Sequence, residues 1–333
     1  MINNKIILIT GGTGSFGKKF VNICFKKFKP KKIIIYSRDE LKQYDMLNSF
    51  PKIKRDKLRF FIGDVRDLPR LKLAMQNVDY VIHAAALKQV PTAEYNPFEV
   101  VKTNIIGGQN VIDAAISMKV KKVIALSTDK AAAPVNLYGA TKLTSDKLFI
   151  AANNFKGKNN ISFSVVRYGN VMGSRGSVVP LFLSQISSGK FTITDKNMTR
   201  FNISLDQGVN YVIDCLIRMI GGELFVPKLS SFRIIDLAKA MSPECEFKFI
   251  GTRPGEKIHE ELITENDSKN TLEFLKEFII LPSFEFYDEK ASKLIYKKYY
   301  NSGKKCKFGF SYNSRDNKDY LSIKNLKDLL KKI

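Results

Sequence analysis

The stretch KIILITGGTGSFG, residues 5–17, decides the fold of this 333-residue chain. Residues 5–10 form an apolar run with the length of a buried parallel strand, and residues 18–28 continue after the glycines with a helical pattern. Glycines at every third position permit a tight turn and let the backbone approach a pyrophosphate, at which the first helical amides point. A strand, a glycine turn and a helix in this order predict a dinucleotide site. The expected cofactor contacts in this turn are Gly11, Thr13, Gly14, Ser15, Phe16 and Gly17.

The next apolar strand, KIIIY at residues 32–36, ends in Ser37, Arg38 and Asp39. A carboxylate at the end of this strand usually holds the ribose of NAD, whereas an arginine accommodates the 2′-phosphate of NADP. Because Ser37 and Arg38 come first, the sequence favours NADP. The alternative is that Arg38 only stacks on the adenine. Further expected cofactor contacts are Asp39, Lys42, Asp64, Val65, Ala84 and Lys88.

A second polar set follows the apolar strand VIAL in the middle of the chain. Thr128, Asp129 and Lys130 bring a hydroxyl, a carboxylate and an ammonium, and Tyr138 and Lys142 lie four residues apart on one helix face. We expect the Lys142 ammonium to lower the pKa of the Tyr138 phenol from its usual value of about 10, so that the tyrosinate can act as a base. This spacing alone is weak evidence, because a surface tyrosine beside a solvated lysine is common. The glycine turn in the same half of the chain favours the catalytic interpretation.

The composition is compatible with a single enzyme of this kind. The net charge of +23 comes from lysines spread along the chain without an aromatic-interleaved motif, so we expect a solvated surface and no nucleic-acid partner. Such a field would also attract an acidic nucleotide sugar. The chain has no run of 18 apolar residues and no leader pattern, which predicts a cytoplasmic protein without a membrane partner. The four scattered cysteines and two histidines predict neither a disulfide framework nor a metal site.

Alternating strands and helices predict an α/β fold of the Rossmann type, a doubly wound parallel sheet with a smaller, interwoven C-terminal substrate lobe. We assign residues 1–168 and about 203–227 to the NADP-binding domain. Residues about 169–202 and 228–333 are assigned to the lobe that holds the substrate.

Further motifs along the chain carry a resemblance to a known family. They are YSRDELKQ (36–43), FIGDVRD (61–67), HAAALK (83–88), AEYNP (93–97), STDKAA (127–132), NLYGATKL (136–143), RYGNVMGSRGSVVP (167–180), MTRF (198–201) and RPGEKIHE (253–260). With the glycine turn, these motifs resemble the extended short-chain dehydrogenase/reductases. More narrowly, they resemble the inverting UDP-N-acetylglucosamine 4,6-dehydratases of pseudaminic acid biosynthesis, over about residues 5–280.

The resemblance implies a definite chemistry. Tyr138 takes the proton of the sugar 4-hydroxyl while a hydride moves from C4 to NADP⁺, and Lys142 holds the nicotinamide ribose. Lys130 removes the C5 proton, Asp129 protonates the departing 6-hydroxyl, and Thr128 belongs to the same catalytic set. The hydride then returns to C6, and C5 is protonated from the opposite face. A lysine base needs a lowered pKa, to which burial, Lys142 and the cofactor could each contribute.

The same resemblance implies the contacts to the substrate. They are Lys88, Asn170, Arg175, Thr199, Arg200, Arg253 and Glu256, with the two arginines Arg175 and Arg253 facing the diphosphate and Glu256 facing the uridine ribose. The chain departs from the family pattern at Gln89, Ala133 and Asn202.

The sequence therefore predicts an NADP-dependent hydro-lyase, a homo-oligomer, that converts UDP-N-acetylglucosamine into UDP-2-acetamido-2,6-dideoxy-β-L-arabino-hex-4-ulose. Retaining relatives carry Asp-Glu where this chain has Asp129 and Lys130, so this pair favours inversion. The alternatives are a retaining 4,6-dehydratase or a 4-epimerase acting on another UDP-sugar, and an NADP-binding regulator without catalysis.

Overall fold

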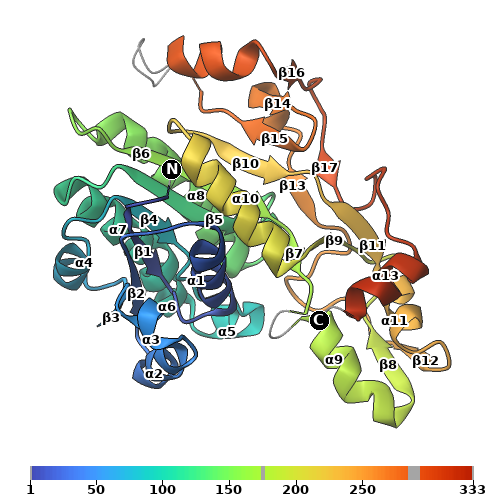
Figure 1. Cartoon of the computed structure of the whole chain (residues 1–333). Coiled ribbons are helices and arrows are strands. Elements are labelled where there is room, and N and C mark those ends of the chain that lie inside the picture. The colour runs from blue at the N-terminus through green and yellow to red at the C-terminus, as the bar shows by residue number, and fades with distance from the viewer. Residues whose placement is uncertain (1, 174–176, 284–292, 332–333) are drawn as a thin grey trace.

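A computed structural model of the protein describes residues 2–173, 177–283 and 293–331 (Figure 1). Within these residues, ten strands form one central sheet in the order β16-β14-β15-β10-β6-β5-β4-β1-β2-β3. Its parallel part consists of β1 (Ile6–Thr10), β2 (Lys32–Ser37), β3 (Leu58–Ile62), β4 (Tyr80–His83), β5 (Lys122–Thr128), β6 (Ser162–Tyr168) and β10 (Leu224–Pro227). The expected doubly wound α/β fold is confirmed.

The strand order reverses between β1 and β4. The chain first builds outward from β1 to β3 and then begins again at β4 on the other side of β1. Ligands of open α/β sheets bind outside the carboxyl ends of the strands at such a switch point. The glycine turn follows β1 directly, so the topology puts it at this point.

Three antiparallel strands extend the sheet beyond β10. They are β15 (Glu277–Ile280), which pairs with β10, then β14 (Thr271–Glu273) and β16 (Lys304–Lys305). All three fall within residues 228–333, which the sequence analysis assigned to the substrate lobe. The free edge of β10 explains their position, because its unpaired backbone groups need hydrogen-bond partners. The division of the chain into two lobes stays a prediction.

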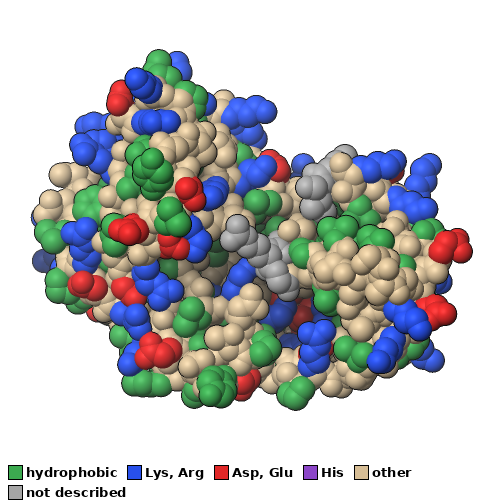
Figure 2. All heavy atoms as spheres, turned by 90° about the horizontal axis from the view of Figure 1, so that it is seen from below, with side chains coloured by type: hydrophobic (Ala, Val, Ile, Leu, Met, Phe, Trp, Pro, Cys, Tyr) green, Lys and Arg blue, Asp and Glu red, His purple; other side chains and the backbone are tan. Residues whose placement is uncertain are grey.

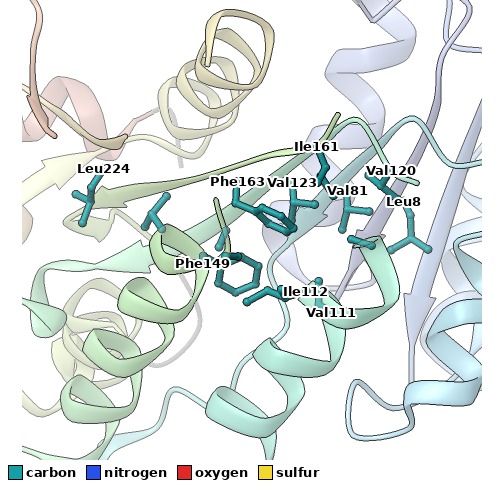
Figure 3. Packing of buried hydrophobic residues seen from close by; sticks show 14 of the residues in the cluster. Leu8, Val81, Val111, Ile112, Val120, Val123, Phe149, Ile161, Phe163 and Leu224 are labelled. Atoms are coloured by element: carbon teal, nitrogen blue, oxygen red, sulfur yellow. The ribbon is translucent and has the colours of Figure 1, made fainter. Parts of the chain in front are cut away.

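Helices cover both faces of the sheet (Figure 1). The pair α1 (Ser15–Lys27) and α10 (Leu205–Arg218) lies on one face, and the group on the other face consists of α4 (Leu68–Ala74), α7 (Gly107–Ser117) and α8 (Leu137–Phe155). Strand β1 shows why both faces are needed, because Leu8 joins one hydrophobic cluster while Ile7 and Ile9 join the other. In Figure 3, Phe149 of α8 lies against Phe163 of β6, beside Val123 of β5.

The remaining elements surround the sheet and form smaller units. Short helices are α2 (Glu40–Asn48), α3 (Lys52–Arg55), α5 (Val90–Tyr95), α6 (Pro97–Val101), η1 (Lys102–Ile106), η2 (Asp129–Ala131), η3 (Ile186–Ser188), η4 (Asp267–Asn270) and η6 (Tyr296–Tyr300). Additional strands are β7 (Asn170–Val171), β9 (Thr199–Ile203) and β11 (Ser230–Arg233), the pair β8 (Lys190–Ile193) and β12 (Glu246–Phe249), and the pair β13 (Glu261–Ile263) and β17 (Tyr312–Asn313). Helices α9 (Val178–Gln185), α11 (Ile234–Met241) and α13 (Ile323–Leu330) enclose a separate apolar cluster with β8.

Positive charge is dispersed over the face of the molecule that Figure 2 shows. Figure 2 shows Lys and Arg side chains scattered over one face, with hydrophobic and acidic side chains between them. Within the described residues, no helix has the length and apolar character needed to span a bilayer. The same residues contain no group of His, Cys, Asp or Glu that could hold a metal ion.

Candidate active site

The glycines of the turn let its backbone pack closely on itself and on the loop after β4. Gly11 has φ of +65°, and a Cβ there would lie 3.0 Å from the backbone of Ala85. A Cβ on Gly17 would lie 2.1 Å from the carbonyl oxygen of Gly12. Helix α1 begins after Gly14 with no side-chain cap among the described residues, so its first amides remain available to a phosphate. This cradle fits the pyrophosphate of a dinucleotide.

The residues at the end of β2 that were expected to contact the cofactor ribose differ in how free they are to do so. The Ser37 hydroxyl is buried and accepts a hydrogen bond from Gln43 (2.9 Å). The Arg38 side chain is 56% exposed and lies 3.7 Å from the carboxylate of Asp64, which also binds Arg66. Asp39 caps α2 through the backbone N–H of Lys42 and pairs with the ammonium of that residue. Arg38 is therefore the expected ribose residue with the most freedom to contact a ligand.

Strand β5 leads into the candidate catalytic loop, which holds the expected residues Thr128, Asp129 and Lys130. The strand ends at Thr128, and the single turn η2 follows at once. The Lys130 ammonium lies 3.1 Å from Asp129 Oδ1 and also 3.1 Å from Glu260 Oε1, and Thr128 Oγ1 donates to Asp129 Oδ1 (2.9 Å). The side chains of Asp129 and Glu260 are 1% and 2% exposed. A cation thus sits between two buried carboxylates.

This arrangement separates the proton affinities of the two carboxylates. Burial and the charge of Glu260 raise the pKa of Asp129, and they outweigh the Lys130 ammonium. Burial acts to raise the pKa of Glu260, but the charges of Lys130 and Arg200 outweigh burial and lower this pKa. Burial acts to lower the pKa of Lys130, yet the charges of Asp129 and Glu260 raise it above its usual value. The expected lowering of the Lys130 pKa is therefore wrong for this structure, because two carboxylates face the ammonium.

Tyr138 and Lys142 lie on α8, one turn apart and buried. Burial raises the pKa of Tyr138 to about 12, although the Lys130 ammonium and a hydrogen bond with Thr128 lower it. The expectation that Lys142 lowers this pKa is wrong, since the cation acting on the phenol is Lys130. Burial lowers the pKa of Lys142, whose ammonium donates to the carbonyl oxygen of Leu126 (2.7 Å).

Two hydrogen bonds connect a segment distant in sequence to the candidate catalytic loop and the residues after it. Asn136 Nδ2 donates to the carbonyl oxygen of Gly255 (2.7 Å), and Lys257 Nζ donates to the carbonyl oxygen of Ala132 (2.6 Å). Residues 253–260, the motif RPGEKIHE, are therefore held beside η2 and the start of α8.

The structure gathers some of the expected substrate residues and leaves others apart. Arg200 Nη2 lies 3.6 Å from Glu256 Oε1, and Arg253 Nε lies 3.9 Å from Glu256 Oε2. The Thr199 hydroxyl is already engaged with His259 and Ser314. Asn170 of β7 is in register with Asn202 of β9, and Lys88 is exposed between β4 and α5. Arg175 lies outside the described residues.

Sequence reasoning missed two residues that shape the site. Glu260 appeared only as a letter of the motif RPGEKIHE, and no local pattern shows that it meets Lys130. Asn104 lies in the π-helical turn η1, where its amide bonds both backbone groups of Leu87 and the hydroxyl of Thr141. It ties the loop after β4 to α8, and a π-turn is frequent at functional sites.

Comparison with known proteins decides the family. The model of the polysaccharide biosynthesis protein family matches residues 7–282. The chain belongs to this family. The resemblance to extended short-chain dehydrogenase/reductases is confirmed.

Three known proteins are similar to this chain over nearly its whole length. The UDP-N-acetylglucosamine 4,6-dehydratase (inverting) of Campylobacter jejuni strain 81-176 is 54% identical, over 99% of this chain and 98% of its own. A UDP-glucose 4-epimerase of Rickettsia canadensis is 42% identical, over 99% of this chain and 96% of its own. The X-ray structure of Pen from Bacillus thuringiensis superimposes with a TM-score of 0.88 at 39% identity, over 100% of this chain and 99% of that one.

Proposed function

We propose that this protein is a UDP-N-acetylglucosamine 4,6-dehydratase that inverts C5. The observation that carries the proposal is the contact between Lys130 and Asp129 at the end of β5, beside Tyr138. Retaining relatives are expected to carry a second carboxylate at the position of the lysine. The 54% identity to an enzyme named as an inverting dehydratase supports the same reading.

The cradle at Gly11 and Gly17 suits a nicotinamide dinucleotide, and Arg38 favours NADP over NAD. A nicotinamide bound there would supply reversible hydride transfer with the sugar, for oxidation at C4 and reduction at C6. Lys142 would hold the nicotinamide ribose. Tyr138 would take the proton of the 4-hydroxyl, and the positive charge of the Lys130 ammonium would favour the phenolate.

The raised pKa of Lys130 is compatible with its role as a base if Asp129 takes its proton. Transfer from Nζ to Oδ1 across the 3.1 Å contact turns an ammonium and a carboxylate into an amine and a carboxylic acid. The net charge of the pair does not change. The amine then accepts the C5 proton, and the carboxylic acid protonates the departing 6-hydroxyl. Both groups needed for elimination arise from one proton transfer.

The substrate contacts follow from charge. Arg175 and Arg253 offer guanidinium groups suited to a diphosphate, and Glu256, beside Arg253, suits a uridine ribose hydroxyl. Lys88 and Asn170 would face the sugar and the diphosphate, and Thr199 and Arg200 would complete the set. We also propose that the protein forms a homo-oligomer.

The experiment is incubation with UDP-N-acetylglucosamine in heavy water, followed by NMR of the fresh product. An inverting dehydratase gives a 4-keto-6-deoxy sugar of L-arabino configuration that carries deuterium at C5. In Lys130→Ala, oxidation at C4 should proceed while water loss and C5 exchange stall. In Tyr138→Phe, turnover should fall by roughly 10²-fold or more while UDP binding persists. A D-xylo product formed first would replace inversion with retention.

A 4-epimerase is the second candidate, since relatives named UDP-glucose 4-epimerase are 42% identical. An epimerase returns the hydride to C4 and keeps the 6-hydroxyl. It would therefore yield a C4 epimer of unchanged mass with no deuterium at C5, in the same experiment.

A further inference from the structure

Glu260 has no role in the chemistry described so far, yet it touches the central cation of the site. Its Oε1 lies 3.1 Å from Lys130 Nζ and 3.6 Å from Arg200 Nε. Its backbone is held by Ser314, whose hydroxyl accepts from the Glu260 N–H (2.9 Å) and whose own N–H donates to the Glu260 carbonyl oxygen (2.8 Å). The carboxylate is thus delivered to Lys130 from a fixed backbone.

The burial of Glu260 argues against an incidental ion pair. Taking a carboxylate out of water costs several kcal/mol, so such groups persist where they are paired or carry a function. Within the described residues, Glu260 Oε2 and Asp129 Oδ2 are buried without a hydrogen-bond partner. One simple salt bridge to Lys130 would need a single carboxylate, and here two converge on it.

We infer that Glu260 is a positioning residue of the elimination. It holds the Lys130 ammonium against Asp129, and its negative charge favours the protonated forms of both groups. The inference rests on the proposed dehydratase function. Glu260 need not touch the sugar. It acts through Lys130, which it keeps within hydrogen-bond distance of Asp129 Oδ1, and through its negative charge beside both.

The surrounding charges fix the direction of the effect. Lys130, Arg200 and Lys257 face Glu260, and their positive charges keep it ionised. Its negative charge raises the pKa of Asp129 and also that of Lys130. Neutralising Glu260 should therefore lower both pKa values together. The acidic and alkaline limbs of the pH–rate profile, one set by the base and one by the acid, should therefore both shift toward lower pH.

The test is the pH profile of kcat for dehydration in Glu260→Gln. We expect the whole profile to move toward lower pH by about one unit or more, as for loss of a charge within about 4–6 Å. We also expect kcat to fall by roughly 10-fold or more with KM changed only a few-fold, because a lost positioning contact affects the reacting geometry. Glu261→Gln is the matched control, since Glu261 is the next residue and makes no ion pair with Lys130 within the described residues. It should leave the profile in place.

Glu260→Asp distinguishes the effect of the negative charge from the effect of side-chain length. It also provides a test if Glu260→Gln does not fold. Because this variant keeps the charge, its pH profile should stay within about half a pH unit of the parent profile. Its kcat should fall, because the shorter side chain pulls Lys130 away from Asp129. A Glu260→Gln profile that matches the parent overturns the inference, and so does a Glu260→Asp profile displaced as for Gln. A parent enzyme that does not dehydrate UDP-N-acetylglucosamine refutes the proposed function itself. That outcome is visible before any variant is compared.

Discussion

Arg167 and Asp146 form an ion pair in the interior, with Arg167 Nη2 3.2 Å from Asp146 Oδ2 and each side chain 3% exposed. Arg167 lies near the end of β6 and Asp146 lies on α8, so the pair joins the sheet to the helix that carries Tyr138 and Lys142. Asp146 also accepts from the hydroxyl of Ser127 on β5 (2.7 Å). This carboxylate therefore connects α8 to both β5 and β6.

Asp146→Ala should lower the free energy of unfolding by about 3–5 kcal/mol, because it leaves the Arg167 guanidinium buried without this partner. Urea denaturation measures the change. Asp214→Ala is the control, since Asp214 pairs with Arg218 on the exposed side of α10 and is 65% exposed. Its cost should be about 1 kcal/mol or less. Equal costs for the two variants would contradict the assignment of Asp146 as a structural anchor.

Acid should weaken the fold through His83. Burial, followed by the charge of Lys142, lowers the pKa of this histidine to about 3. The unfolded chain takes up a proton below about pH 6.5 while the native state does not, so stability is lost as pH falls from about 6.5 toward 3.

The loss due to His83 should be about 1.4 kcal/mol between about pH 7.5 and about pH 5.5, and His83→Asn should lack it. Urea denaturation of parent and variant at both pH values gives the difference. The same pH dependence in both proteins would show that His83 is not the group responsible.

Arg38 should decide between the two nicotinamide cofactors. Mass spectrometry of the denatured protein should detect NADP(H) that survived purification. Arg38→Ala should weaken NADP binding by about 10–100-fold and NAD binding little, as expected for loss of one charge-assisted contact. Arg70→Ala is a suitable control, because that guanidinium already donates to the carbonyl oxygen of Ile62. Bound NAD alone, with affinity unchanged in Arg38→Ala, would reverse the preference.

Ala133 has a strained backbone conformation three residues after Lys130. Its φ of +42° lies in the left-handed region, and its side chain is exposed. Ala133→Gly should raise the free energy of unfolding by about 1 kcal/mol, since glycine adopts this region without a Cβ clash. The neighbouring Ala132→Gly should destabilise the protein, because Ala132 has φ of −82° and is buried. Thermal unfolding distinguishes the two, and a lower midpoint for Ala133→Gly would contradict the prediction.

Much of the fold could be predicted because its signals are local. The strands at residues 5–10 and 32–36 were expected within one position of β1 and β2, since buried parallel strands have the sequence pattern of short apolar runs. The strands β14, β15 and β16 could not be assigned to the sheet in the same way. Their position depends on the open edge of β10, which lies far from them in sequence and has no local pattern.

The candidate site, like the fold, was predictable from the sequence only in part. The sequence by itself determined that a glycine turn follows β1, that Thr128, Asp129 and Lys130 follow β5, and that Tyr138 and Lys142 share a helix face, because each depends on spacing within one element. Only the tertiary structure decided the electrostatics. Glu260 reaches Lys130 across 130 positions of chain and, with Asp129, raises its pKa, while burial raises that of Tyr138. Both effects come from distant charges and from desolvation, which exist only once the chain has folded.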